Sequence, residues 1–291
     1  MQNTFIKSCI VTAAPVFFLS VLIMGCGGSK TKSQTNTDSV VKNVTTVSMP
    51  KNATDSLISI TNPTAKKIMH ALYRGYNAKD KTATWLCNNP DKLAKFKVPG
   101  DTKFSSKLLF LDSITIKGVK QLYVITSSRP NGDDFVCHGC APLEEVFIFE
   151  KDAAAWRLIY RKIFDQTGSF GESPAFTLKK LGTDSYGFMI EPGFTGQGIT
   201  EQSIGMYSYY QAEFKSILTI PEVAMDNKGA CDDKVSGNCW SYDYTLKFAA
   251  TPANYNDIIL KKKGTESKDG KVMAVDTTIK YQFAGNMYMA K

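Results

Sequence analysis

The clearest alternation of hydrophobic and polar positions lies between residues 240 and 248. Aromatic or aliphatic side chains occupy every second position, and small or charged ones occupy the positions between them. A period of two residues predicts a strand with one buried face. The apolar positions are Trp240, Tyr242, Tyr244, Leu246 and Phe248.

Two further segments continue this pattern towards the C-terminus. Residues 255–262 follow a turn at Thr251-Pro252, and residues 273–283 follow a turn at residues 268–270. Apolar residues alternate again in the second segment. Three consecutive strands joined by short turns predict an antiparallel meander.

More strands are predicted in the middle of the chain. The run Val146–Phe149 is apolar at each position, which is typical of a central strand buried on both faces. Lys151-Asp152 ends this run, and Trp156–Phe164 resumes it as a hairpin partner. Shorter apolar or β-branched runs predict strands at residues 122–125, 176–178 and 186–190, with turns at residues 129–134 and 182–185.

One helix is predicted ahead of the strands. Asn62-Pro63 supplies a capping side chain followed by proline at the first helical position. An apolar stripe with helical spacing follows, and Gly75 weakens its end. His70 lies just off this stripe and is expected at the surface or the edge of the core. The stripe consists of Ala65, Ile68, Met69, Leu72 and Tyr76.

These elements predict a mainly β (α+β) fold, an antiparallel sheet with one N-terminal helix packed against it. Because strands do not alternate with helices, a parallel doubly wound sheet is not expected. The pattern leaves open whether the sheet forms a sandwich, a barrel or a partial propeller.

The first residues carry a different pattern. One positive charge, Lys7, precedes an uncharged apolar run from Cys9 to Met24, and Gly25-Cys26 closes it. This three-part layout is that of a secretory signal. The ending, with Ile23 three residues before Cys26, resembles the bacterial lipoprotein signal. The alternative is an uncleaved membrane anchor, for which the run is short.

The resemblance implies cleavage before Cys26 and attachment of lipid to the sulfur and the new amino group of this residue. Gly27 follows, rather than the aspartate that often retains such proteins in the inner membrane, so the resemblance implies the outer membrane. Residues 1–25 are then a signal peptide. Residues 26–56, rich in Ser, Thr, Asn and Lys, are expected to be a flexible tether, and residues 57–291 a single folded domain.

Charge narrows the range of partners. Without residues 1–25 the chain keeps 34 basic against 27 acidic side chains, a net charge of +7. Such an excess favours anionic surfaces modestly. No basic helix or aromatic RNA-binding signature accompanies it, so nucleic acid is not expected. The expected partners are the membrane, through lipid on Cys26, and an envelope protein or an anionic polymer.

Export would place five more cysteines in an oxidising compartment. Cys231 and Cys239 bracket a polar loop just before the strand at residues 240–248, and we expect a bridge between them. Closing this loop of about nine residues would stabilise the fold by roughly 2.5 kcal/mol. The other disulfide candidates are Cys87, Cys137 and Cys140.

Cys137-His138-Gly139-Cys140 is the motif that suggests chemistry. A histidine between two cysteines could poise a redox pair, and the same three side chains could contribute to a zinc site. However, no second ligand cluster accompanies them, and a strand rather than a helix is predicted after them. A structural bridge between them, or from one of them to Cys87, is the third alternative. With Ala141-Pro142 the string resembles one in uncharacterised exported bacterial proteins, which implies no activity.

Hydrolytic and phosphate-binding motifs are absent from the sequence, so neither a catalytic residue nor a cofactor is predicted. The favoured function is that of a non-enzymatic envelope lipoprotein, acting as a binding, inhibitor or assembly module. The alternative is a thiol-disulfide or metal-handling protein that uses Cys137, His138 and Cys140.

Overall fold

A computed structural model describes residues 58–231, 238–252 and 254–291, which all belong to one compact unit, Val47–Lys291. The predicted signal peptide, the lipidation residue Cys26 and the predicted tether at residues 26–56 lie outside the described residues. Within the described residues, no helix is both long enough and apolar enough to cross a membrane.

The first half of the described chain forms a seven-stranded sheet, in which every pairing is antiparallel. The order β1-β7-β6-β5-β4-β3-β2 is a meander except for β1, which pairs with the last strand. The strands are β1 (Ser59–Ile60), β2 (Tyr76–Asn77), β3 (Thr82–Leu86), β4 (Lys103–Ile116), β5 (Val119–Pro130), β6 (Leu143–Asp152) and β7 (Ala155–Asp165).

The second half forms a nine-stranded antiparallel sheet. Its order is β16-β15-β14-β13-β12-β11-β9-β8, and β10 also pairs with β11. The strands are β8 (Thr177–Lys180), β9 (Tyr186–Ile190), β10 (Gly193–Gly196), β11 (Ile199–Tyr210), β12 (Glu213–Asp226), β13 (Ser241–Ala249), β14 (Asp257–Lys268), β15 (Lys271–Ala284) and β16 (Met287–Ala290).

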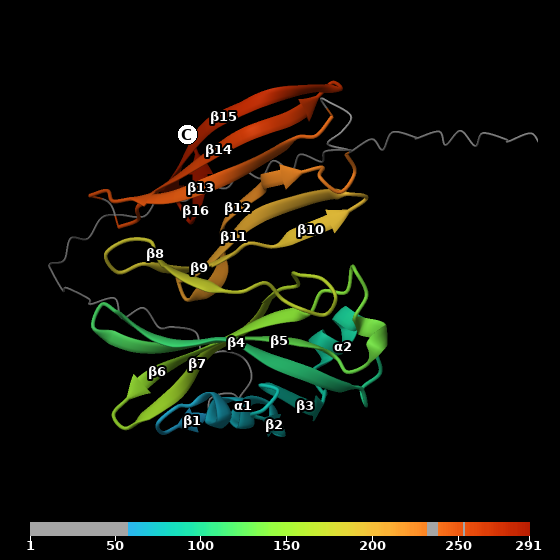
Figure 1. The fold of residues 1–291 in the computed structure, drawn as a ribbon. Coiled ribbons are helices and arrows are strands. Elements are labelled where there is room, and N and C mark those ends of the chain that lie inside the picture. The colour runs from blue at the N-terminus through green and yellow to red at the C-terminus, as the bar shows by residue number, and fades with distance from the viewer. Residues whose placement is uncertain (1–57, 232–237, 253) are drawn as a thin grey trace, which may run out of the picture. The chain divides into compact units, whose positions relative to one another are not determined.

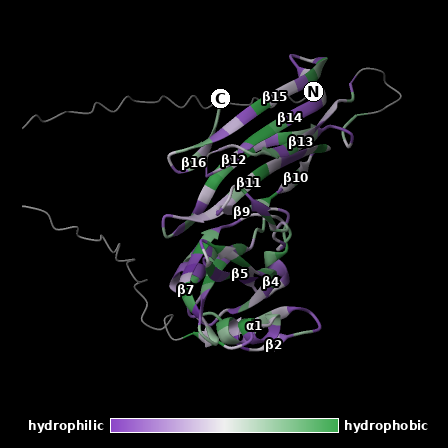
Figure 2. Ribbon diagram, turned by 90° about the vertical axis from the view of Figure 1, so that its left-hand side faces the viewer, coloured by the Kyte–Doolittle hydropathy of each residue, from purple (hydrophilic) through white to green (hydrophobic). Residues whose placement is uncertain are grey.

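These sheets confirm the predicted mainly β, antiparallel fold. The predicted C-terminal meander is β13-β14-β15, paired over most of its length. Figure 2 shows hydrophobic and hydrophilic positions alternating along these strands. The apolar run at residues 146–149 lies in β6, where each side chain from Leu143 to Phe149 is buried.

The predicted N-terminal helix is present as α1 (Ala65–Tyr73), but the prediction of Asn62 as its N-cap is wrong. Thr64, not Asn62, caps it by accepting a hydrogen bond from the Lys67 amide at 3.3 Å. Asn62 has a positive φ of 48° and therefore lies in the turn before the helix. The helix ends at Tyr73 because Arg74 and Gly75 both adopt positive φ, so Tyr76 belongs to β2.

A second helix, α2 (Pro90–Phe96), was not predicted. Asn89 caps it by accepting from the Lys92 amide at 3.0 Å, and Pro90 occupies the first helical position. This is the same cap-and-proline signal that was assigned near Asn62. The helix has only seven residues, too few for a hydrophobic period to show in the sequence.

Apolar side chains gather on both faces of the first sheet. One cluster combines Ile68, Met69 and Tyr73 of α1 with alternate residues of β5, β6 and β7. The other face of the same strands packs against Phe188, Tyr207 and Phe214 of the second sheet. Strands β4–β7 therefore lie between α1 and the second sheet, as Figure 1 shows. A third apolar cluster is formed by side chains of the second half of the chain, of which Leu181 is the first and Tyr288 the last in sequence.

Candidate functional site

A buried ion pair lies between α2 and β6. The Lys92 ammonium is 2.6 Å from the Glu145 carboxylate, and the two side chains are 0% and 1% exposed. Arg161 of β7 contacts the other carboxylate oxygen at 2.7 Å. Capping by Asn89 sets the start of α2 and so places Lys92 on its inner face, and the alternation of β6 points Glu145 to the side of Phe147.

Neutral polar groups complete the surroundings of this pair. The Tyr73 hydroxyl lies 2.6 Å from Thr126 Oγ1 and donates to Glu145 at 3.1 Å, and Lys92 donates to Ser128 at 3.2 Å. Within the described residues, no buried side-chain nitrogen or oxygen lacks a hydrogen-bond partner. The pair is therefore fully compensated, which a charge taken out of water requires.

The charges of this cluster shift the pKa values of Glu145 and Tyr73 in opposite directions. Burial acts to raise the pKa of Glu145, but Lys92 and Arg161 outweigh it and hold that pKa below its usual value. Burial and the Glu145 charge raise the pKa of Tyr73 well above its usual value. The Lys92 ammonium also lies 5.3 Å from the ring centre of Tyr73 and 5.2 Å from that of Trp85, a cation–π arrangement.

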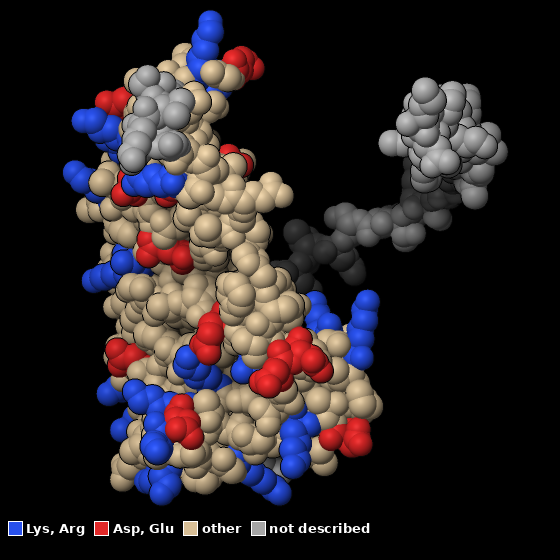
Figure 3. Space-filling model, turned by 45° about the vertical axis from the view of Figure 1, so that its right-hand side comes forward, with Lys and Arg blue, Asp and Glu red and all other residues tan. Residues whose placement is uncertain are grey.

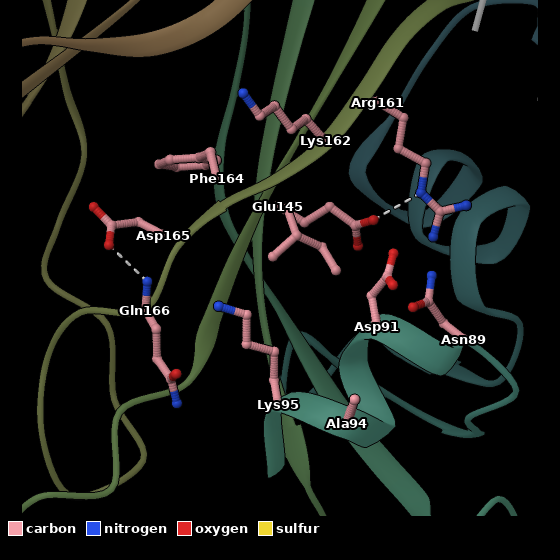
Figure 4. Close-up of a pocket in the computed structure, with 11 residues that line it drawn as sticks. Asn89, Asp91, Ala94, Lys95, Glu145, Arg161, Lys162, Phe164, Asp165 and Gln166 are labelled. Atoms are coloured by element: carbon pink, nitrogen blue, oxygen red, sulfur yellow. Dashed lines mark hydrogen bonds and ion pairs between the residues drawn. The ribbon is translucent and has the colours of Figure 1, made fainter. Parts of the chain in front are cut away.

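A groove opens directly beside the ion pair (Figure 4). Its volume is about 830 Å³, and one wall is α2 while the other is the end of β7. Figure 4 shows Asp91 and Lys95 extending from α2 towards β7. The lining residues are Asn89, Asp91, Ala94 and Lys95 of α2 and its cap, Glu145 of β6, and the six consecutive residues 161–166.

The β7 wall of this groove is a strand edge. Six consecutive residues can line one cavity only if both faces and the backbone between them reach it, because side chains alternate along a strand. Among the described residues, no strand pairs with the outer edge of β7 beyond Leu158. The groove is thus bounded by backbone on one side and by a charged helix on the other.

Several groups hold this wall in place. Lys162 pairs with Glu213 of β12 at 2.6 Å, and the Tyr207 hydroxyl donates to Asp165. Gln166 donates from Nε2 to the Ala141 carbonyl at 2.9 Å. Both signs of charge face the groove, with Asp91 and Asp165 beside Lys95 and Arg161.

A second open cavity, of about 960 Å³, adjoins this groove. Its walls come from α1, β3 and the segment before α2, and it also includes Ile58, the first described residue. Asn89 and Arg161 line both cavities. The described chain therefore begins at the cavity that adjoins the groove.

Glu144, the neighbour of Glu145, points to the opposite face of β6. It is fully buried and accepts hydrogen bonds from the Thr167 amide, the Thr167 hydroxyl and the Ser173 hydroxyl. Burial outweighs these bonds and raises the pKa of Glu144 to about 7.

The cysteine motif lies elsewhere. Cys137 and Cys140 are joined in a disulfide. The backbone amides of Phe170 and Gly171 donate hydrogen bonds to the carbonyls of Cys137 and Cys140, respectively, and so hold the loop in place. The His138 ring lies 4.9 Å from that of Phe170 and 4.8 Å from that of Phe194, and all three side chains are exposed. The motif follows a 3₁₀ turn at Asp133–Phe135 and leads into β6, so no α-helix begins at it.

The other cysteines are accounted for within the described chain. The expected bridge between Cys231 and Cys239 is present, whereas Cys87 is buried and unbridged, so the alternative bridge from the motif to Cys87 is wrong. Burial raises the pKa of the Cys87 thiol. The described residues contain no group of three or more His, Cys, Asp or Glu side chains placed to hold a metal. With both motif sulfurs in a disulfide, the zinc alternative has lost two of its ligands.

Sequence reasoning missed the ion pair and the groove. One available signal was Glu144-Glu145 directly before the apolar run at residues 146–149, because two acidic residues entering a central strand need buried partners. The second was Asn89-Pro90, which announces α2 and with it Lys92.

Fold and site together define a class: an antiparallel β protein of two sheets, with a polar groove built beside a buried ion pair. Comparison of the chain with protein-family models, with curated proteins and with solved structures finds no match.

Proposed function

We propose that the protein is a lipid-anchored lipoprotein of a bacterial cell envelope and a non-enzymatic binding module. The groove between α2 and β7 is its binding site, and the ligand is a segment of an envelope polypeptide. The observation that carries this proposal is the edge of β7 at residues 161–165, which forms one wall of the groove and which no described strand pairs with on that side. A strand edge offers backbone donors and acceptors to an added polypeptide strand.

The charges of the groove favour a polypeptide over an anionic polymer. Cationic Lys95 and Arg161 are accompanied by anionic Asp91 and Asp165, so a uniformly negative chain would meet repulsion as well as attraction. Figure 3 likewise shows basic and acidic side chains interspersed over one face of the molecule. A polypeptide can carry both signs of charge in a defined order.

The lipid anchor is supported by the sequence at Cys26 and by its order of charge, apolar run, small residue and cysteine. Two or three acyl chains hold a protein stably on a membrane, whereas one holds it only marginally. We expect the wild-type protein in the outer-membrane fraction, with lipid mass on its N-terminal peptide. The Cys26→Ser variant should remain an unlipidated precursor. Wild-type protein that is wholly soluble and carries no lipid would contradict this assignment.

Binding at the groove is tested with a photo-crosslinking residue placed at Lys95 in the full chain, in intact cells. The matched control carries the same residue at Asp276 of β15, which lines neither the groove nor the adjoining cavity. We expect crosslinked protein adducts at Lys95 and none at Asp276. Equal labelling at both positions, or turnover of ester, peptide or glycoside substrates by the purified protein, would overturn the proposal.

One observation favours a second candidate, thiol-disulfide chemistry at Cys137–Cys140. The disulfide is at the surface and has an exposed histidine inside its loop. Alkylation followed by mass spectrometry tests it: a bridge opened by mild reductant, while Cys231–Cys239 stays closed, would favour redox work. A bridge that resists mild reductant would favour a structural role.

A further inference from the structure

A pocket of about 380 Å³ lies at the junction of the two sheets, between the turn after β4 and the turn after β11. It shares no lining residue with the groove beside α2. Its volume lies within the range of about 300–1,000 Å³ that is typical of small-molecule sites. Five of the chain's 13 tyrosines line this one pocket, so aromatic side chains with hydroxyl groups dominate it. They are Tyr123, Tyr186, Tyr209, Tyr210 and Tyr255.

Burial divides the lining into a floor, walls and a rim. Tyr123 and Phe188 are buried, with ring centres 5.3 Å apart, and form the floor. The other four tyrosines are half-buried and form the walls. Aromatic surface at the base and hydrogen-bonding groups at the mouth suit a small ligand with an apolar face and a polar edge. The rim consists of exposed polar side chains, those of Lys117, Asp184, Gln211 and Asn254.

The aromatic walls are held in place by the protein itself. Tyr255 stacks on Phe283, with ring centres 3.7 Å apart, and the ring centre of Tyr209 lies 5.0 Å from that of Tyr160. A ligand therefore meets rings that are already ordered, which lowers the entropic cost of binding. Tyr186 differs, because within the described residues its ring joins no aromatic pair and its hydroxyl makes no hydrogen bond. The exposed part of this side chain remains for a ligand.

The polar groups of the pocket favour a neutral ligand. Burial raises the pKa of Tyr123 and of Tyr209, so both phenols keep their protons and can donate as well as accept hydrogen bonds. At the rim the Asp184 carboxylate accepts, the Lys117 ammonium donates and the Gln211 amide does both. One charge of each sign favours neither an anion nor a cation. A molecule with many hydroxyls can pair with each of these groups.

The turn that carries Gln211 is strained. Gln211 and Ala212 have φ values of 52° and 61°, so both adopt the left-handed conformation. Two-residue hairpin turns of this kind favour Asn-Gly or Asp-Gly, because most side chains are unfavourable there. Backbone strain of this kind clusters at ligand sites. Here it places a glutamine at the rim of the pocket.

We propose that this pocket binds one sugar unit of a neutral saccharide. A pyranose ring has C–H faces, which pack on aromatic rings, and hydroxyls around its edge, which pair with carboxylate, amide and phenol groups. A free oligosaccharide and an envelope glycan offer the same unit. The site goes beyond the proposed function, because the groove beside α2 contributes nothing to it.

Saturation-transfer NMR tests the pocket with the full chain in a detergent that has no sugar headgroup. The probes are cellobiose, maltose and chitobiose, and choline is added as a cation that aromatic cages bind. We expect transfer to the ring protons of at least one saccharide and none to choline. Transfer to no saccharide, or to choline in place of the saccharides, would overturn the proposal.

Co-sedimentation with insoluble cellulose and chitin then identifies the source of the sugar. Retention by a polymer supports a glycan chain as the ligand. Binding of the soluble sugars alone supports a free oligosaccharide.

Variants of Tyr186 place the binding in this pocket. Tyr186→Ala should weaken binding of the saccharide at least about tenfold, because a packing face for the sugar is lost. Tyr186→Phe keeps the ring and should weaken it only a few-fold. Equal losses in the two variants would show that the ring is not a platform for the sugar.

Gln211→Gly is the sharper test, because it removes the amide and also relieves the strained backbone. Glycine is unstrained at a φ of 52°, which offsets its greater freedom in the unfolded chain, so the thermal unfolding midpoint should change little. Binding should fall several-fold. The matched control is Gln197→Gly, which changes the same residue type at the same φ of 52° in the turn between β10 and β11, outside the pocket. Unchanged binding in Gln211→Gly, or an equal fall in both variants, would overturn the assignment of the sugar to this rim.

Discussion

At the residue scale, Glu145 is the group on which the interior of the first sheet depends. Its carboxylate is shared by Lys92, Arg161 and Tyr73, which come from three different elements. A complete buried ion pair adds little net stability, but removal of one partner leaves a charge in a place that cannot solvate it.

We therefore predict that Lys92→Met destabilises the protein by about 3–5 kcal/mol. The matched control is Lys261→Met, which breaks an exposed pair with Asp276 at 3.2 Å and should cost less than about 1 kcal/mol. Urea unfolding monitored by circular dichroism measures both free energies of unfolding. Equal losses in the two variants would show that Lys92 does not compensate a buried charge.

Glu144 predicts a pH dependence of the opposite kind to that of an ordinary carboxylate. Its pKa is about 7 in the folded protein, against about 4.5 when unfolded, so the folded state holds the proton more tightly. Its contribution to stability is present below pH 4.5 and is lost as pH rises to 7. Ionising the buried carboxylate then costs on the order of 3 kcal/mol.

We expect Glu144→Gln to remove this dependence. The difference in free energy of unfolding between pH 5 and pH 8 should shrink by a few kcal/mol relative to wild type. Glu172→Gln, at an exposed carboxylate, is the control and should leave the difference as it was. An unchanged difference in Glu144→Gln would mean that this carboxyl titrates normally in the folded protein.

At the element scale, the sequence predicted those strands in which each face lies wholly in the core or wholly towards solvent. The alternation at residues 240–248 is complete because the odd positions of β13 face solvent and the even ones face the core. Strand β6 could be recognised because both of its faces are buried. These patterns report burial directly, so the strands and their meander order could be predicted.

Other elements show no hydrophobic period in the sequence, for physical reasons. Helix α2 is too short for a period, and the long strands β11 and β12 contain register shifts that break their alternation. The groove needs α2, β6 and β7 to be placed together, and residues 89 and 161 are far apart in the chain. No local pattern encodes that meeting, so the disulfide motif stood out while the groove did not.

In a tight turn, whether one position is glycine can decide how much backbone strain the turn holds. Gly270 joins β14 to β15 with a φ of 74°, and a Cβ added there would meet nothing within 4 Å. Gly270→Ala should therefore cost about 1 kcal/mol from backbone strain alone. Gly100→Ala, which has equal space and no positive φ, should cost close to nothing. Thermal unfolding of the two variants compares them, and equal midpoints would contradict the strained turn.

At the scale of the whole molecule, one apolar cluster links the two sheets. Phe214 of β12 is completely buried, and it packs with Phe188 and Tyr207 of its own sheet and with Phe164 of β7. The Tyr160 hydroxyl of β7 also accepts from the Phe214 amide at 3.0 Å. Each sheet thus completes the core of the other.

We predict that the sheets unfold together. Variants that keep only Trp156, in the first sheet, or only Trp240, beside the second, should report the same denaturant midpoint by fluorescence. Phe214→Ala should lower both midpoints together, by about 3–5 kcal/mol in free energy of unfolding. Two separate midpoints in the variants that keep Phe214 would show that the sheets are independent.

The two-residue pairing of β1 with β7 has a mechanical consequence for a protein pulled from its N-terminus. Force applied there reaches β1 before any other described strand, and β1 is held by two residue pairs, whereas β6 and β7 share nine. The pairing of β1 with β7 is therefore the first to break under force. Its release would free residues 58–64, up to the start of α1, and allow this segment to extend to roughly 24 Å at about 3.4 Å per residue. A short pull would extend the chain by releasing β1 alone, while β2–β7 and the second sheet stay paired.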